Sequence, residues 1–198
     1  RIQGKTKGNV LLRKSQYILS DDENYSTHLA KLFIAGKIQN YRNILRRYIR
    51  DYGESYEVEN ISNELDKYKR DILLSNNKTE IIGFEGIAAN NYFSVFPNLI
   101  LQQKQDFPFN GRNRRPPKDA VNALLSLAYT LIANDITSAL ETIGLDPYVG
   151  FLHTLRPGRT SLSLDLMEEL RAYLGDRFVL SLINKRQITK NDFLFQGE

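Results

Sequence analysis

The chain has 198 residues, 41% of them hydrophobic, and a formal net charge of +4 at neutral pH. Its length suffices for one sizeable core, and the lack of cysteine excludes disulfides, thiolate metal sites and cysteine nucleophiles. No signal peptide is recognisable, and the longest apolar run, residues 124–133, is too short to span a bilayer. We therefore expect a soluble, cytoplasmic protein with no membrane partner.

The first fourteen residues differ in character from the rest of the chain. Residues 1–14 contain two glycines and a short apolar run at residues 10–12, a pattern that favours a strand or a linker. We expect them to be the tail of a preceding domain. Residues 15–198 should then form a single helical domain.

Helical periodicity begins after that tail, since apolar residues recur every three or four positions. Asp21 or Asp22 can cap a long first helix, which Gly53 ends. A second helix is expected from about residue 58 to 74. A third, capped by Thr79, should continue to residue 97.

The second half of the chain also predicts helices. Residues 118–143 are apolar nearly all round, so we expect them to form the central core helix. Shorter helices should run from Thr160 or Ser161 to residue 174 and, after Gly175 or Asp176, to residue 188. The predicted fold class is all-α, a multi-helix domain with a short β or linker remnant at its N-terminus.

Basic residues gather in three stretches, at residues 42–50, 111–118 and 155–159. The first is either the solvated face of a helix or a phosphate-binding surface. The other two lie in Gly/Pro-rich loops, where arginine does not serve to stabilise a helix. We therefore expect phosphate contacts in these two loops.

A histidine and an acidic helix form one candidate site. His153 precedes an arginine-rich turn, whereas His28, the other histidine, lies in an amphipathic helix and is expected at or near the surface. At helical spacing, Asp165, Glu168 and Glu169 share the arc opposite a leucine-rich side. That arc is either a solvated acidic face near a helix N-terminus, or it supplies one or two carboxylates that bind a divalent cation together with His153. Such donors suit Mn²⁺ or Mg²⁺.

Glu85 is a further candidate ligand. It lies between Phe84 and Gly86 at an otherwise apolar helix start. Burying its charge there without a partner would be costly. The glutamate is therefore either simply exposed near the helix N-terminus or part of a site.

Five stretches, in this order, extend through nearly the whole chain: GNVLLRKSQY (8–17), GFEGIAANNYF (83–93), FNGRNRRPPKDAVNALLSLAYTLI (109–132), GFLHTLRPGRTSLSLDLMEELR (150–171) and LINKRQITKNDF (182–193). Together they resemble the CRISPR-associated Cas-one endonuclease/integrase family. The resemblance implies a helical catalytic domain that works in CRISPR adaptation.

The resemblance also implies residue roles. Glu85, His153 and Glu168 would bind Mn²⁺ or Mg²⁺, and Asp165 would be the acidic catalytic partner one turn earlier. The family often has Asp at the later position, so the choice between Asp165 and Glu168 as direct ligand stays open. The residues expected near DNA, or supporting the site, are Arg112, Arg115, Asn122 and Arg159.

The reaction implied by the family is attack of a protospacer 3′-hydroxyl on a phosphodiester of the CRISPR repeat. The implied partners are double-stranded DNA (protospacer and repeat), a second copy in a homodimer, and the small Cas-two protein. A complete family member begins with a β-rich domain, of which residues 1–14 would be the tail. The chain alone would therefore be weak or inactive as an integrase.

Three alternatives are compatible with the residue patterns alone. One is a non-catalytic helical module that binds DNA through its basic loops. Another is a helical scaffold that binds only protein. A third is a different metal-dependent phosphohydrolase, although the chain has no adjacent His-Asp pair.

Overall fold

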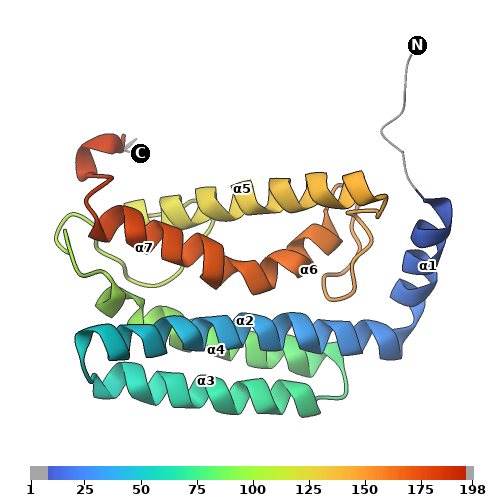
Figure 1. Ribbon diagram of the computed structural model, residues 1–198, viewed down its shortest axis with the longest axis horizontal. Helices are drawn as coiled ribbons and strands as arrows, with labels where there is room; N and C mark the ends of the chain where they lie inside the picture. Colours follow the sequence, from blue (N-terminus) through green and yellow to red (C-terminus); the bar gives the residue numbers. More distant parts are fainter. Residues whose placement is uncertain (1–8, 195–198) are drawn as a thin grey trace.

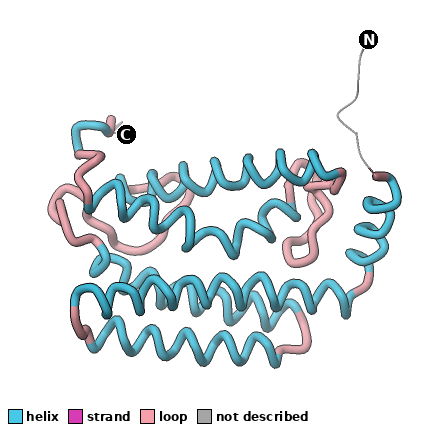
Figure 2. Tube along the Cα trace, in the orientation of Figure 1, coloured by secondary structure: helices cyan, strands magenta, loops and turns pink. Residues whose placement is uncertain are grey.

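The computed structural model describes residues 9–194, and within them every regular element is a helix. In chain order these are α1 (Val10–Asp21), α2 (Glu23–Tyr52), α3 (Tyr56–Leu74), α4 (Lys78–Leu99), α5 (Ala120–Ile143), α6 (Ser161–Leu170), the π-helical segment η1 (Arg171–Asp176), α7 (Arg177–Asn184) and the 3-10 turn η2 (Lys190–Asp192). Figure 2 shows helices and loops but no strand in the described part of the chain. The predicted all-α fold class is confirmed.

The N-terminal expectation is wrong where it can be checked. Residues 10–12 form the first turn of α1 instead of a strand or linker, because the Asn9 side chain accepts hydrogen bonds from the backbone N–H groups of Leu11 and Leu12. The helical part therefore starts before the expected boundary at residue 15. Residues 1–8 lie outside the described residues.

Side-chain caps mark the starts of α2 and α4, whereas α3 and α6 begin without one. Asp22 accepts hydrogen bonds from the backbone N–H groups of Asn24 and Tyr25 at the start of α2, which confirms one of the two predicted caps. At α4 the predicted cap, Thr79, is wrong by two positions. Asn77 caps this helix instead, with its side-chain oxygen 2.9 Å from the N–H of Glu80.

The helices form two layers that meet at α2 (Figure 1). α2, α3 and α4 pack together in one layer, and α5, α6 and α7 lie in the other. α2 contacts α1, α3, α4, α6 and η1, so it is the central helix. Side chains that α2 directs toward α6 and α4 therefore lie between the layers.

The expectation that residues 118–143 form the central helix is wrong. α5 lies at the edge of its layer, and Leu127 and Leu131 on its outer side are 57% and 53% exposed. By length and apolar content α5 could cross a membrane. In this fold it instead packs against α6, η1 and α7. Its hydrophobicity therefore did not indicate its depth in the core.

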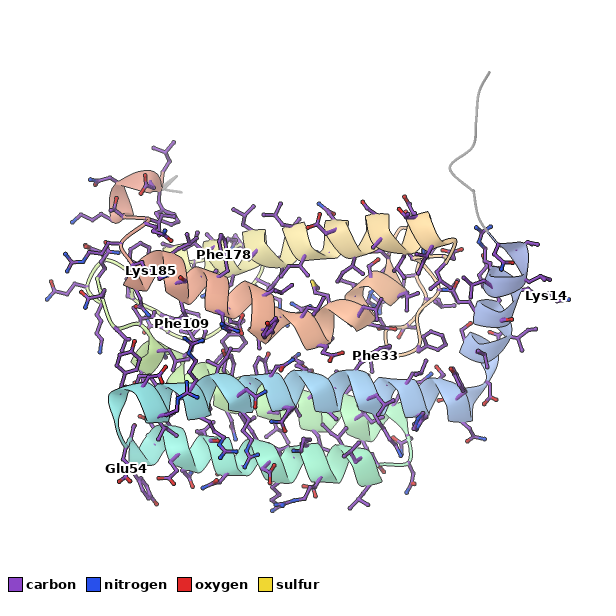
Figure 3. The ribbon with its side chains drawn as sticks, viewed as in Figure 1. Lys14, Phe33, Glu54, Phe109, Phe178 and Lys185 are labelled. Carbon is purple, nitrogen blue, oxygen red and sulfur yellow. The ribbon has the colours of Figure 1, made fainter. Side chains whose placement is uncertain are left out.

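Aromatic rings dominate the core between α2 and α4. Tyr41 stacks on Tyr92 with ring centroids 3.8 Å apart, and Phe93, Phe96 and Phe109 (the last labelled in Figure 3) pack beside them. A second, smaller cluster surrounds Leu140, Phe151 and Leu162 and includes Phe33 of α2, also labelled in Figure 3. This second cluster anchors the loop between α5 and α6.

α1 is hydrogen-bonded to the same loop. The Gln16 side chain is buried; its Nε2 donates to the carbonyl oxygens of Asp146 and Val149 at 2.8 and 2.9 Å, and its Oε1 accepts from the N–H of Asp146 at 2.8 Å. Each polar atom of this amide therefore has a backbone partner. The loop that carries His153 is therefore held by the cluster around Leu140 and by the hydrogen bonds from Gln16.

The predicted break at Gly175 or Asp176 is absent, because α6, η1 and α7 follow one another without a loop. A Cβ at Gly175 would lie 2.8 Å from Cε1 of Tyr129, so the glycine lets α5 and η1 approach closely. The π-helical geometry shifts the register of the side chains that follow. Gly175 serves helix packing here and does not end a helix.

Candidate functional site

His153 is held in place by Asp165. The backbone N–H groups of Phe151 and Leu152 donate to Oδ2 of Asp165 at 2.6 and 3.0 Å, and that of His153 donates to Oδ1 at 2.9 Å. Nδ1 of His153 lies 2.6 Å from the same Oδ1. A carboxylate next to Nδ1 favours the proton on that nitrogen, so Nε2 is the nitrogen left to bind a ligand.

Asp165 has no capacity left for a metal. It is fully buried, and each of its oxygens already accepts from two protein groups. Gly150 makes this arrangement possible, because a Cβ there would lie 2.6 Å from Oδ2 of Asp165 and 2.8 Å from the carbonyl carbon of Ser161. Asp165 therefore lies behind His153 and fixes its orientation.

A buried ammonium group lies between the other two predicted ligands. Lys37 of α2 is 2% exposed; its Nζ contacts Oε1 of Glu85 and lies 2.6 Å from Oε2 of Glu168. Arg171 adds a second cation, 3.0 Å from Oε1 of Glu168. These four side chains, from α2, α4, α6 and η1, form one ionic cluster between the layers.

Charges in this cluster stabilise one another. Burial alone raises the pKa of Glu168, but the adjacent Lys37 and Arg171 outweigh it and lower that pKa to about 2. Burial lowers the pKa of Lys37, yet Glu168 together with Glu85 raises it above its ordinary value. Glu168 and Lys37 are therefore both ionised at neutral pH.

One cavity joins the predicted ligands. Glu85, His153, Glu168 and Arg159 line a hollow of about 220 Å³, whose other walls include Ile34 and Leu152. Residues far apart in the sequence, on α4, on the α5–α6 loop and on α6, thus face one small space. Asp165 does not line it, because it lies behind the histidine.

Of the three acidic residues of α6, only Glu169 lies on a solvated face, as one of the two alternatives predicted. Asp165 and Glu168 are buried, because α6 packs between α2 and α5, whereas Glu169 is exposed. His28 is exposed, as expected. Glu85 is neither fully exposed nor buried, and its charge has the lysine as its partner.

The donor set fits a divalent ion, but the side chains are not already closed around one. Among residues 9–194, no group of three or more histidine, aspartate or glutamate side chains is arranged as a metal site. The ammonium of Lys37 lies where two of the three ligands converge. Two carboxylates and one imidazole are suitable donors for Mg²⁺ or Mn²⁺. An entering cation would have to take over the role of Lys37 as counter-charge.

The predicted DNA-contacting residues fall into two groups. Asn122 is fully buried; it accepts from Nη1 of Arg112 at 2.8 Å and donates to the carbonyl oxygen of Gly111 at 2.9 Å. This pair organises the 109–119 loop, and the Asn122 amide has its hydrogen-bond partners within that loop and the start of α5. Arg115 is exposed on the same loop, and Arg159 lines the ligand cavity.

A larger hollow of about 550 Å³ begins at Glu85 as well. Its polar lining comes from Asn90, Asn110, Arg112 and Arg114, and Phe93 and Phe109 are among its apolar lining residues. Because Glu85 lines both cavities, the two hollows meet at this glutamate. Its cationic and amide side chains are suited to phosphate oxygens, whereas Phe93 and Phe109 belong to the buried core.

Sequence reasoning missed Lys37 and Arg171. The signal for Lys37 was available, since it falls on the same helical stripe as the apolar residues Ile34, Ile38 and Tyr41. A charge on an apolar stripe needs a buried partner. For Arg171, the spacing of three from Glu168 was the corresponding signal.

Known proteins match the chain along its length. The family model described as CRISPR associated protein Cas1 matches residues 1–198. CRISPR-associated endonuclease Cas1 1 of Chlorobaculum tepidum is 50% identical over 196 residues, which cover 98% of this chain and 57% of that protein. The chain thus spans little more than half the length of that curated relative.

Solved structures agree in fold. A CAS1 protein from Thermotoga maritima superposes with a TM-score of 0.84 at 26% identity, covering all of this chain and 60% of that one. A chain of a Cas6-RT-Cas1–Cas2 complex gives a TM-score of 0.82 at 25% identity, covering 98% of this chain and 21% of that one.

Proposed function

Because the chain belongs to the Cas1 family of CRISPR-associated proteins, we propose that it is the helical catalytic domain of a metal-dependent DNA endonuclease and integrase of CRISPR adaptation. The observation that carries the proposal is the single cavity lined by Glu85, His153, Glu168 and Arg159. Those side chains combine metal-ligand chemistry with a cation able to hold a phosphate.

Each residue has a role in the proposed site. Glu85, Glu168 and Nε2 of His153 would hold Mn²⁺ or Mg²⁺, which would supply positive charge beside the scissile phosphate. Asp165 keeps the proton on Nδ1 and fixes the imidazole in one orientation. Arg159, at the cavity wall, holds a phosphate oxygen.

The reaction we propose is transesterification. The 3′-hydroxyl oxygen of a protospacer forms a bond to phosphorus in the CRISPR repeat while the bond from phosphorus to the repeat's own 3′-oxygen breaks. The attacking hydroxyl gives up its proton, the leaving oxygen takes one up, and no covalent link to the enzyme forms. Water in place of the hydroxyl gives hydrolysis at the same site, which accounts for endonuclease activity.

The proposed partners follow from the family. They are double-stranded DNA from protospacer and repeat, a second copy of the protein, and the small Cas2 protein, which is named in the complex of one structural relative. We place the reaction in the cytoplasm with no membrane partner. The chain alone, without the further length of its relatives, should be weak or inactive as an integrase.

Cleavage of labelled DNA by the natural full-length protein tests the metal site. With Mn²⁺ the parent should cut, and a chelator should stop it. Glu85→Gln should bind DNA as the parent does without cutting it, whereas Glu141→Gln, the same change at an exposed position of α5, should cut normally. Cutting that survives both chelation and Glu85→Gln would exclude this site. Binding without any cutting would favour a non-catalytic DNA-binding module.

A further inference from the structure

A second cationic hollow lies between α2 and the η1–α7 segment, away from the predicted ligands. It measures about 720 Å³ and is lined by Asn40, Asn43, Ile44, Arg46, Arg47, Arg50, Tyr173 and Arg177. Four of these eight side chains are arginines and none is acidic. In Figure 1, α7 lies above the half of α2 that ends at Tyr52.

Several of its arginines are available to an anion. Arg47 and Arg50 share Asp51 at 3.2 and 2.9 Å, but their side chains remain 57% and 71% exposed. Arg46 and Arg177 have no carboxylate within ion-pair distance among residues 9–194. The C-terminal end of a helix favours cations, which accounts for Arg50 but not for a concave group of four.

An aromatic ring forms part of the same hollow. The guanidinium of Arg177 lies 5.0 Å from the ring centroid of Tyr173, which is 54% exposed. Stacking holds a guanidinium in a fixed orientation and leaves its N–H groups directed outward. Asn40 and Asn43 add neutral hydrogen-bonding groups to the wall. This composition is suited to phosphate oxygens and sugars.

The hollow continues the helix stripe that carries Lys37. Asn40, Ile44 and Arg47 follow Lys37 at spacings of three and four residues, so they lie along one side of α2. Arg47 is ten positions beyond Lys37, which corresponds to about 15 Å along the helix, whereas Arg46 and Arg50 lie toward the opposite side of α2.

We propose that this hollow, the α2–α7 arginine groove, binds the phosphate backbone of duplex DNA away from the reacting phosphate. The inference rests on the proposed function, because it takes DNA as the substrate. It adds a contact that holds the duplex in register and does not take part in the chemistry.

The test is the salt dependence of duplex binding by the natural full-length protein, measured by fluorescence anisotropy with a labelled duplex. The groove variant is Arg46→Gln with Arg177→Gln. The control, with the same loss of charge, is Arg70→Gln with Arg186→Gln, at exposed positions outside the groove. All four arginines are exposed, so the variants should remain folded, and their circular dichroism spectra check this.

We expect the groove variant to release fewer counterions than the parent. Losing two phosphate contacts makes the slope of log K against log salt less negative by about 1.8. The ratio of parent to groove-variant affinity should therefore fall about 12-fold between 50 and 200 mM salt. The control should keep the parent's slope. A groove variant with the parent's slope would overturn the inference.

The same samples separate this inference from the proposed function. If the parent binds and cuts DNA with Mn²⁺ but the groove variant keeps its slope, the catalytic proposal stands and the groove proposal fails. If the parent neither binds nor cuts DNA, both fail. If the groove variant has a less negative slope than the parent but cuts DNA normally at saturating concentration, both proposals are supported.

Discussion

Asp165→Asn tests how the site is built. The substitution keeps the shape of the side chain but replaces one acceptor oxygen by an NH₂ group, which then faces protein N–H donors. Whichever oxygen is replaced, two hydrogen bonds are lost, either those from Phe151 and Leu152 or the two from His153. A hydrogen bond to a charged group contributes about 1.5 to 3 kcal/mol, so the free energy of unfolding should fall by about 3 to 6 kcal/mol.

The same variant should bind metal less well. When the NH₂ group takes the place of Oδ1, the imidazole of His153 loses the oxygen that fixes its orientation, and losing such a support lowers metal affinity about 10- to 100-fold. Urea unfolding measures the first effect, and calorimetric titration with Mn²⁺ measures the second. Glu169→Gln removes the same charge from an exposed position of α6 and serves as the control. An Asp165→Asn protein within about 1 kcal/mol of the parent, with unchanged Mn²⁺ affinity, would refute the reasoning.

Three further predictions concern the surroundings of the site. Lys37→Met removes a buried counter-ion, so the protein without metal should lose about 3 to 5 kcal/mol of stability, and Mn²⁺ should raise its melting temperature more than the parent's; equal shifts would contradict this. Gly150→Ala should lower both stability and Mn²⁺ affinity, because its Cβ meets backbone atoms, whereas Gly86→Ala, with open space around it, should not lower Mn²⁺ affinity. Burial raises the pKa of Asp176 from 3.8 to about 6. The protonated carboxyl therefore adds to the free energy of unfolding below about pH 4, and this contribution is lost as the pH rises through 6. Relative to Asp176→Asn, the parent's free energy of unfolding should therefore fall by roughly 3 kcal/mol from pH 4 to pH 7, and a pH-independent difference would refute the assignment.

Local rules accounted for most of the helices. Gly53, the cap at Asp22 and the end of α5 at Gly144 were visible because each depends on residues next to it in the sequence. Depth in the core was not visible in the same way. α5 is more apolar than α2, yet α2 is central, because depth depends on how many helices surround a segment.

The candidate site was predictable as a set of residues but not as an arrangement. Glu85, His153 and Glu168 were identified, the set being completed by a family resemblance, and the fold brings them to one cavity. The separate role of Asp165 was not predictable, because it depends on three backbone N–H groups from a loop. Lys37 was missed because its partners lie 48 and 131 positions away in the sequence.

The central claim is that His153 belongs to a catalytic metal site. The most direct measurement is strand transfer of a protospacer into a supercoiled plasmid carrying the repeat, by the natural full-length protein with Cas2 and Mn²⁺. His153→Ala should abolish the product while DNA binding persists, and His28→Ala, at the exposed second histidine, should integrate like the parent. Normal integration by His153→Ala would contradict the claim and reduce the histidine to a structural residue.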